Sequence, residues 1–246
     1  MNSKYDDEQF FQEYAKMNRS QKGLQAAGEW HQLQLLFPGL EGKDVLDLGC
    51  GYGWHCEYAA KQKARKILGI DQSYKMILEA RKKHTANNID YRVCDLCSYE
   101  YPKDTWDLVV SNLVLHYVKD LEWVFEHVHQ TLKPNGIFLL NIEHPVFTSG
   151  IHQDWIYDKQ GKIQYWAIDD YFKPGERSTH FLGCEVKKQH HTLTQILMGL
   201  IHTGFELLVV EEATPSLEMM ELPGMKDELR RPMMLLVKAK AIKSTF

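Results

Sequence analysis

The 246-residue sequence lacks several features that mark secreted or membrane proteins. It has only five cysteines, an odd number scattered along the chain, so no disulfide framework is expected. Its longest apolar runs, residues 108–115 and 233–237, are far shorter than the roughly 20 residues of a membrane-spanning helix. The polar N-terminal residues lack the apolar stretch of a secretory signal. We therefore expect a cytoplasmic protein that does not contact a membrane.

Concentrated positive charge is also missing. The formal net charge is -4, whereas proteins that bind a nucleic-acid backbone concentrate lysine and arginine. The lysines of residues 238–243 indicate a solvated chain end rather than a binding arm. The expected partner is therefore a small molecule and not a nucleic acid, and a homodimer is left open as an option. The length and the 44% hydrophobic content fit one globular domain over residues 1–246.

Short apolar runs alternate with helix-length segments through the first half of the chain. Helices are expected at residues 54–61, after Ser73, and at 121–132, where residues 133–136 stop the last one. Parallel strands need such crossover connections, so the pattern predicts an α/β fold: a doubly wound, mostly parallel sheet with helices on both faces. We divide this half into an N-terminal helical cap at 1–42 and a cofactor-binding core at 43–143. The strands are expected at residues 44–48, 66–70, 91–93, 106–111 and 137–142.

The alternation stops after Glu143. Residues 144–190 have no sustained helical period, are rich in aromatic residues, and suggest a hairpin around Gly161. A long irregular stretch inside a compact domain is usually functional, so we interpret it as an inserted substrate lid without regular structure beyond that hairpin. The closing segment, residues 191–246, should contain a helix that ends at Gly204 and strands at 205–210 and 233–238, separated by a loop.

A glycine-rich loop follows the first predicted strand. Gly49, Gly51 and Gly53 allow the backbone to turn tightly and to approach a ligand closely. Asp71 ends the second strand, where a carboxylate can hold the hydroxyls of a ribose. The loop lacks the third glycine of the dinucleotide pattern, and the charge of Asp47 would repel a pyrophosphate. A phosphate-free, cationic nucleoside such as S-adenosylmethionine suits this site better.

The run from Val45 to Gly53 resembles motif I of the class I S-adenosylmethionine-dependent methyltransferases. Residues 94–96 are similar to the acidic motif beside adenine in that family, and residues 132–136 to the turn before its fifth strand. Residues 107–118 resemble the fourth-strand motif of the small-molecule branch that includes the ubiquinone- and biotin-pathway methyltransferases. The resemblance implies a Rossmann-like sheet of about seven strands, the last antiparallel, and methyl transfer to a small-molecule acceptor that the sequence does not identify.

The resemblance also implies a set of cofactor-binding residues. Gly49 and Gly51 would face the methionine part of the cofactor, and Asn112 would lie at its reactive end. Tyr14 and Arg19 are candidates for closing over the cofactor, with Arg19 pairing with its carboxylate; the alternative is that both are ordinary surface groups. The full set is Asp47, Gly49, Cys50, Gly51, Gly53, Asp71, Gln72, Met76, Asp95, Leu96, Asn112, Leu113, Tyr14 and Arg19.

Methyl transfer from a sulfonium is an in-line displacement that depends mainly on alignment and on exclusion of water. A base near pKa 7 helps when the acceptor carries a proton, and histidine is the usual choice. His144 is our first candidate, because it follows the fifth strand on the expected ligand-binding rim. His116 and His190, or its neighbour His191, are the others. The chain has 12 histidines, so a structural role is the alternative for each.

Two other functions compete with methyl transfer. A sensor that binds S-adenosylmethionine without transferring its methyl group would be favoured by a degenerate glycine loop. A nicotinamide-dependent oxidoreductase would be favoured by a third glycine at the dinucleotide spacing. The sequence has neither feature. Cys94 and Cys97 form a C-x-x-C pair with no second pair at zinc-finger spacing, so no metal site is predicted.

Overall fold

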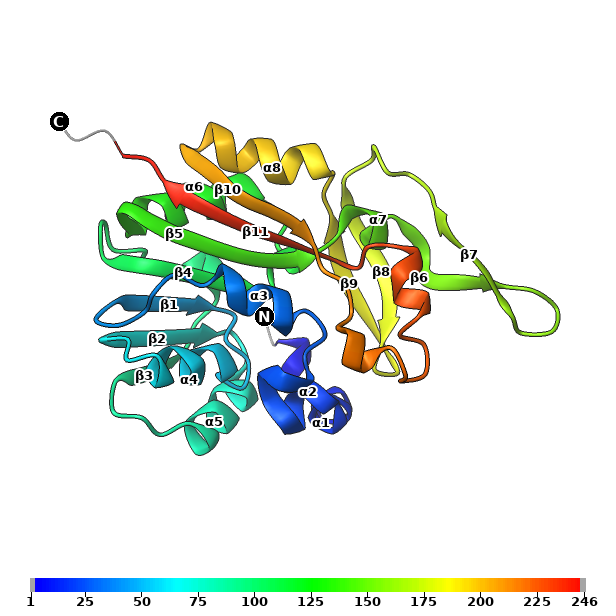
Figure 1. Cartoon of the computed structure of the whole chain (residues 1–246), viewed down its shortest axis with the longest axis horizontal. Helices are drawn as coiled ribbons and strands as arrows, with labels where there is room; N and C mark the ends of the chain where they lie inside the picture. Colours follow the sequence, from blue (N-terminus) through cyan, green and yellow to red (C-terminus); the bar gives the residue numbers. More distant parts are fainter. Residues whose placement is uncertain (1–2, 244–246) are drawn as a thin grey trace.

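The computed structural model of the protein describes residues 3–243. Seven strands form one central sheet in the order β10–β11–β5–β4–β1–β2–β3 (Figure 1). The strands β1 to β5 pair in parallel, whereas β11 is antiparallel to both of its neighbours, β5 and β10. The α/β fold and the antiparallel last strand are confirmed. The strand bounds are β1 Asp44–Leu48, β2 Lys66–Asp71, β3 Ile89–Val93, β4 Trp106–Asn112, β5 Leu132–Glu143, β10 Phe205–Glu212 and β11 Met234–Ala241.

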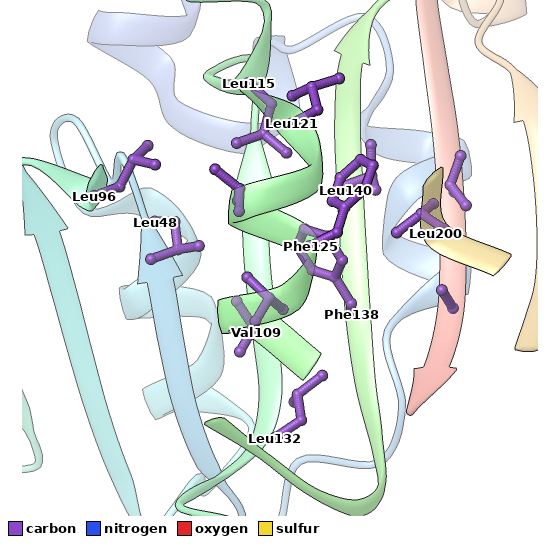
Figure 2. Close-up of a cluster of buried hydrophobic side chains, with 14 of the residues drawn as sticks. Leu48, Leu96, Val109, Leu115, Leu121, Phe125, Leu132, Phe138, Leu140 and Leu200 are labelled. Carbon is purple, nitrogen blue, oxygen red and sulfur yellow. The ribbon is translucent and has the colours of Figure 1, made fainter. Parts of the chain in front are cut away.

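Helices cover both faces of the sheet. One buried cluster joins α3 (Trp30–Leu36), α4 (Trp54–Lys61) and α5 (Tyr74–Lys83) to the sheet, and a second joins α6 (Leu121–Thr131) and α8 (Leu193–His202). The apolar residues of α6 recur at helical spacing and are therefore buried together. Figure 2 shows Phe125 of α6 beside Phe138 of β5, and the two ring centroids are 6.3 Å apart. These two clusters form the hydrophobic core.

The helix α6 ends at Thr131, just before the turn predicted at residues 133–136, but the next strand does not wait until after that turn. The strand β5 begins directly at Leu132, which pairs with Trp106, and the regular register resumes only at Leu108 and Ile137. The intervening residues therefore form an irregularity inside the strand. The Lys133 ammonium anchors it, because Nζ lies 2.6 Å from a carboxylate oxygen of Asp107.

Two antiparallel β-ribbons occupy the region beyond the carboxyl end of β5 (Figure 1). After the short helix α7 (Pro145–Thr148), β6 (Gly150–Tyr157) pairs with β7 (Ile163–Ile168), and β8 (Gly175–Phe181) pairs with β9 (Cys184–His190). The hairpin around Gly161 is confirmed. The expectation of irregular structure in the rest of 144–190 is wrong, since α7, β8 and β9 are regular elements. The sequence did not indicate β8 and β9, because they carry so many polar residues that the alternation of their two faces is hidden.

The N-terminal segment packs beside the glycine loop. It consists of η1 (Lys4–Asp6), α1 (Glu8–Lys16), α2 (Asn18–Lys22) and η2 (Gly23–Ala26). The Asp6 carboxylate accepts hydrogen bonds from the Ser73 hydroxyl at 2.7 Å and from the Lys75 backbone N–H at 3.1 Å, which joins this segment to the start of α5. Four further 3-10 turns are η3 (Leu96–Ser98), η4 (Leu115–Tyr117), η5 (Leu217–Met219) and η6 (Asp227–Arg230). Within residues 3–243, no helix has the length and apolar character needed to cross a bilayer.

Candidate active site

A cavity of about 680 Å³ lies where the carboxyl ends of the parallel strands meet the N-terminal segment and the ribbons. Parallel sheets bind ligands at this edge because the loops that follow their strands converge there. Most of the cofactor residues that the sequence predicted line the cavity. They are Tyr14, Arg19, Gly49, Cys50, Gly51, Asp71, Gln72, Met76, Asp95, Leu96, Asn112 and Leu113.

The glycine loop is bound to the second strand by its own backbone. The N–H groups of Gly49 and Cys50 both donate to the Ile70 carbonyl, at 2.8 and 2.9 Å. Gly49, Gly51 and Gly53 all have positive φ, at 73°, 52° and 79°. Residues other than glycine rarely adopt this backbone conformation, so the tight turn depends on the three glycines.

Asp71 links the glycine loop to the start of α5. Its carboxylate accepts from the Gly51 N–H at 3.0 Å and from the Ser73 N–H at 2.8 Å. Burial raises its pKa to about 6, although both hydrogen bonds favour the ionised form. Each carboxylate oxygen still has capacity to accept a second hydrogen bond. These free acceptor positions beside the cavity fit the two hydroxyls of a ribose.

Asp47 and Gly53 do not line the cavity, contrary to the cofactor set inferred from the sequence. Asp47 is 1% exposed and lies behind the loop, where its Oδ2 is 3.4 Å from the Cys56 thiol. Burial raises its pKa to about 7, so it is not a fully charged group facing a cationic ligand. A Cβ at Gly53 would lie 2.3 Å from the Tyr91 hydroxyl, so this glycine permits packing inside the protein.

Arg19 pairs with a carboxylate that the sequence analysis missed. Its guanidinium lies 2.6 Å from Glu29, which is only 2% exposed, and the Asn112 amide approaches the same oxygen at 3.4 Å. Burial opposes ionisation of Glu29, but the Arg19 charge holds its pKa below the usual value. Arg19 is therefore a partly buried group held by an ion pair, and not a loose surface side chain. The one sequence feature that could have indicated this buried carboxylate is the position of Glu29 directly before the helix α3, whose other buried residues are apolar.

His116 is the histidine of the three candidates that lines the cavity. It is 3% exposed, and its Nε2 lies 3.8 Å from Glu143 Oε1. Its Nδ1 is buried and has no hydrogen-bond partner among residues 3–243. Burial lowers its pKa to about 4, while Glu143 acts in the opposite direction. The imidazole is therefore neutral at pH 7, with one ring nitrogen free.

His144, the first candidate from the sequence, lies outside the residues that line the cavity. Its Nδ1 accepts the Val146 N–H at 3.0 Å and caps α7, while its Nε2 lies 3.0 Å from Glu212. The strand end placed it on the correct rim, but the ring is turned toward the start of α7 and the end of β10. The prediction that His144 lines the ligand site is therefore corrected: its ring contacts Val146 and Glu212 and not the cavity.

His190 and His191 likewise lie outside the residues that line the cavity. The two ring nitrogens of His190 lie 2.7 Å from the Thr148 hydroxyl and 2.8 Å from the Tyr171 carbonyl. His191 lies 2.8 Å from the Val118 carbonyl. Each of these contacts joins the ribbons to neighbouring segments, which is a structural use of the side chain.

Lys188 and Glu143 form a second buried pair that the sequence analysis missed. Lys188 Nζ lies 2.5 Å from Glu143 Oε1 and 3.4 Å from Gln153 Oε1, and all three residues line the cavity. Lys188 is 4% exposed and Glu143 is 7% exposed. The sequence gives no clear signal for this pair, because Lys188 is seen to share the buried face of β9 with Val186 and His190 only once the strand is known.

Comparisons with known proteins agree with this fold. A family model described as a methyltransferase domain matches residues 46–140. A solved S-adenosylmethionine-dependent methyltransferase from Mesorhizobium loti is 39% identical, with a TM-score of 0.82, over 89% of this chain and 100% of that one. The chain belongs to the S-adenosylmethionine-dependent methyltransferases. A Listeria monocytogenes protein assigned to the same group is 43% identical, with a TM-score of 0.86, over 90% of this chain and 100% of that one.

A further relative of the methyltransferase is an uncharacterised protein from Haemophilus influenzae. It is 28% identical over 98% of this chain and 99% of its own length.

The methyltransferase uses S-adenosylmethionine as its cofactor, and the cavity fits that molecule. Gly51 has open space on its cavity side, since the nearest atom to a Cβ built there is the Tyr14 hydroxyl at 4.0 Å. The free acceptor positions of Asp71 lie beside it.

Proposed function

We propose that the methyltransferase acts on a small-molecule acceptor enclosed in the same cavity as the cofactor. The observation that carries this proposal is that one cavity is lined both by the glycine loop and by side chains of the two ribbons. The ribbon residues Gln153, Thr179 and Lys188 come from residues 144–190, which supports the interpretation of this segment as a substrate lid. An enclosed site excludes water, which favours transfer to the acceptor over side reactions.

His116 is the general base in this proposal. S-adenosylmethionine, when bound, supplies the activated methyl group. The Nδ1 of His116 takes the proton of an oxygen or nitrogen nucleophile. The imidazole is unprotonated at pH 7, and the Glu143 charge offsets part of the basicity that the ring loses through burial. The Glu143 carboxylate, 3.8 Å from Nε2, stabilises the imidazolium that results.

Transfer of radiolabel tests the proposal. The enzyme is incubated with methyl-labelled cofactor and a fractionated metabolite extract, and the expected label appears in a small molecule. His116→Gln should lower kcat by about 100-fold or more at saturating cofactor, with unchanged affinity for S-adenosylhomocysteine. His144→Gln is the matched control and should retain the wild-type kcat. Label found only in macromolecules, or full activity of His116→Gln, would refute the corresponding part of the proposal.

The two alternative functions give different results in binding experiments. A sensor would bind the cofactor tightly and yield no labelled product from any fraction. An oxidoreductase would be stabilised by NADH and not by S-adenosylhomocysteine in a thermal-shift titration, because the ligand of the native state raises the melting temperature by mass action. We expect stabilisation by S-adenosylhomocysteine together with labelled product.

A further inference from the structure

Glu143, Gln153 and Lys188 bring polar groups from three separate strands to the ribbon side of the cavity. The pair of Lys188 with Glu143 uses one oxygen of the carboxylate and leaves Glu143 Oε2 buried, without a hydrogen-bond partner in the described chain. Gln153 Nε2 is buried and unpartnered in the same way. Buried polar atoms are almost always hydrogen-bonded in folded proteins. An acceptor and a donor without partners, on two side chains that line one cavity, therefore point to a ligand.

The charges of this cluster cancel. The Lys188 ammonium is compensated by Glu143, and the neighbouring His116 is neutral at pH 7. Aromatic rings flank the ammonium, since Nζ lies 5.7 Å from the ring centroids of both Phe147 and Phe181. A ligand that brought its own charge would be left without compensation in this buried place. The cluster therefore favours an uncharged polar group.

We propose that these three residues form the recognition subsite for the methyl acceptor, and that the acceptor carries an uncharged amide or hydroxyl group. This group donates to Glu143 Oε2 and accepts from Gln153 Nε2 or Lys188 Nζ, while an apolar part of the molecule lies against the rings of Phe147 and Phe181. The inference rests on the proposed function, because it names the chemical class of the acceptor for that site.

Three probes with the same ring test the subsite: benzamide, benzoate and benzylamine. Each is titrated into the enzyme saturated with S-adenosylhomocysteine, and binding is followed by ligand-observed NMR. The wild type should prefer benzamide. Glu143→Gln leaves the Lys188 charge alone and should shift the preference toward benzoate by about tenfold or more, and Lys188→Met should shift it toward benzylamine by a similar factor.

Two further variants separate recognition from general damage to the fold. The double variant Glu143→Gln with Lys188→Met is neutral again and should restore the preference for benzamide. Lys187→Met removes the same charge one residue away, where the side chain is 66% exposed and paired with Glu176 on the surface. It should leave the preference of the wild type unchanged.

The possible failures are distinguishable. Preference of the wild type for a charged probe, preferences that do not change in either single variant, or no binding of any probe at millimolar concentration would overturn the subsite. Methyl transfer to a small molecule could still be observed in each of those cases. Conversely, absence of labelled product together with the expected probe preferences would refute the proposed function and leave the subsite standing.

Discussion

Two glycines of the cofactor loop should fail for different reasons when each is replaced by alanine. Both have positive φ, so either substitution costs about 1 kcal/mol in backbone strain. A Cβ at Gly49 would lie 2.3 Å from Val114 Cγ2, whereas a Cβ at Gly51 meets nothing closer than the Tyr14 hydroxyl at 4.0 Å. Overpacking adds about 1–3 kcal/mol at Gly49 alone. Gly49→Ala should therefore damage folding, and Gly51→Ala should damage binding.

Calorimetry measures both effects. For a chain of this size about 1 kcal/mol corresponds to roughly 2–4 °C in Tm, so Gly51→Ala should lose about 2–4 °C and Gly49→Ala two to four times as much. The new methyl group at position 51 faces the cavity, so the Kd for S-adenosylhomocysteine should rise by about tenfold or more, equivalent to about 1.4 kcal/mol. Wild-type affinity in Gly51→Ala, or equal loss of Tm in the two variants, would refute this reasoning.

The remaining predictions concern charged groups. Asp71→Ala should raise the Kd for S-adenosylhomocysteine by about 10- to 100-fold in calorimetry while the protein stays folded, and unchanged affinity would rule out the ribose role. Asp47 has a pKa raised to about 7, so the native state keeps a proton that the unfolded chain releases above pH 4, and stability falls as pH rises toward 7. In urea unfolding, the free energy of unfolding of the wild type should fall by about 3 kcal/mol more than that of Asp47→Asn between pH 5 and 8. Equal decreases in the two proteins would contradict this. The Arg231 guanidinium lies 4.6 Å from the Trp166 ring centroid and 4.8 Å from that of Phe147. Arg231→Met should therefore speed hydrogen exchange in β6 and β7, and unchanged exchange would show that this contact does not hold the ribbon.

The position of each strand end could be predicted from the sequence, but the direction of each side chain could not. His144 and His116 both follow strands whose carboxyl ends meet at the ligand edge, and the strand-end argument that favoured His144 says nothing about where either ring points. In the structure a backbone N–H of α7 and the Glu212 carboxylate hold His144, whereas His116 lines the cavity and its Nδ1 has no hydrogen-bond partner among the described residues. Such orientations depend on partners that are distant in the sequence.

The sequence by itself determined the features that depend on local order. Hydrophobic period, helix caps and the glycine loop need only neighbouring residues, and the parallel topology then brings the loops to one edge of the sheet. Only the tertiary structure decided which charges meet. The Arg19 pair with Glu29 joins α2 to the residue that precedes α3, and the Glu143 pair with Lys188 joins the sheet to a ribbon. Burial of a charge requires a partner, and that partner is found through packing because no local pattern specifies it.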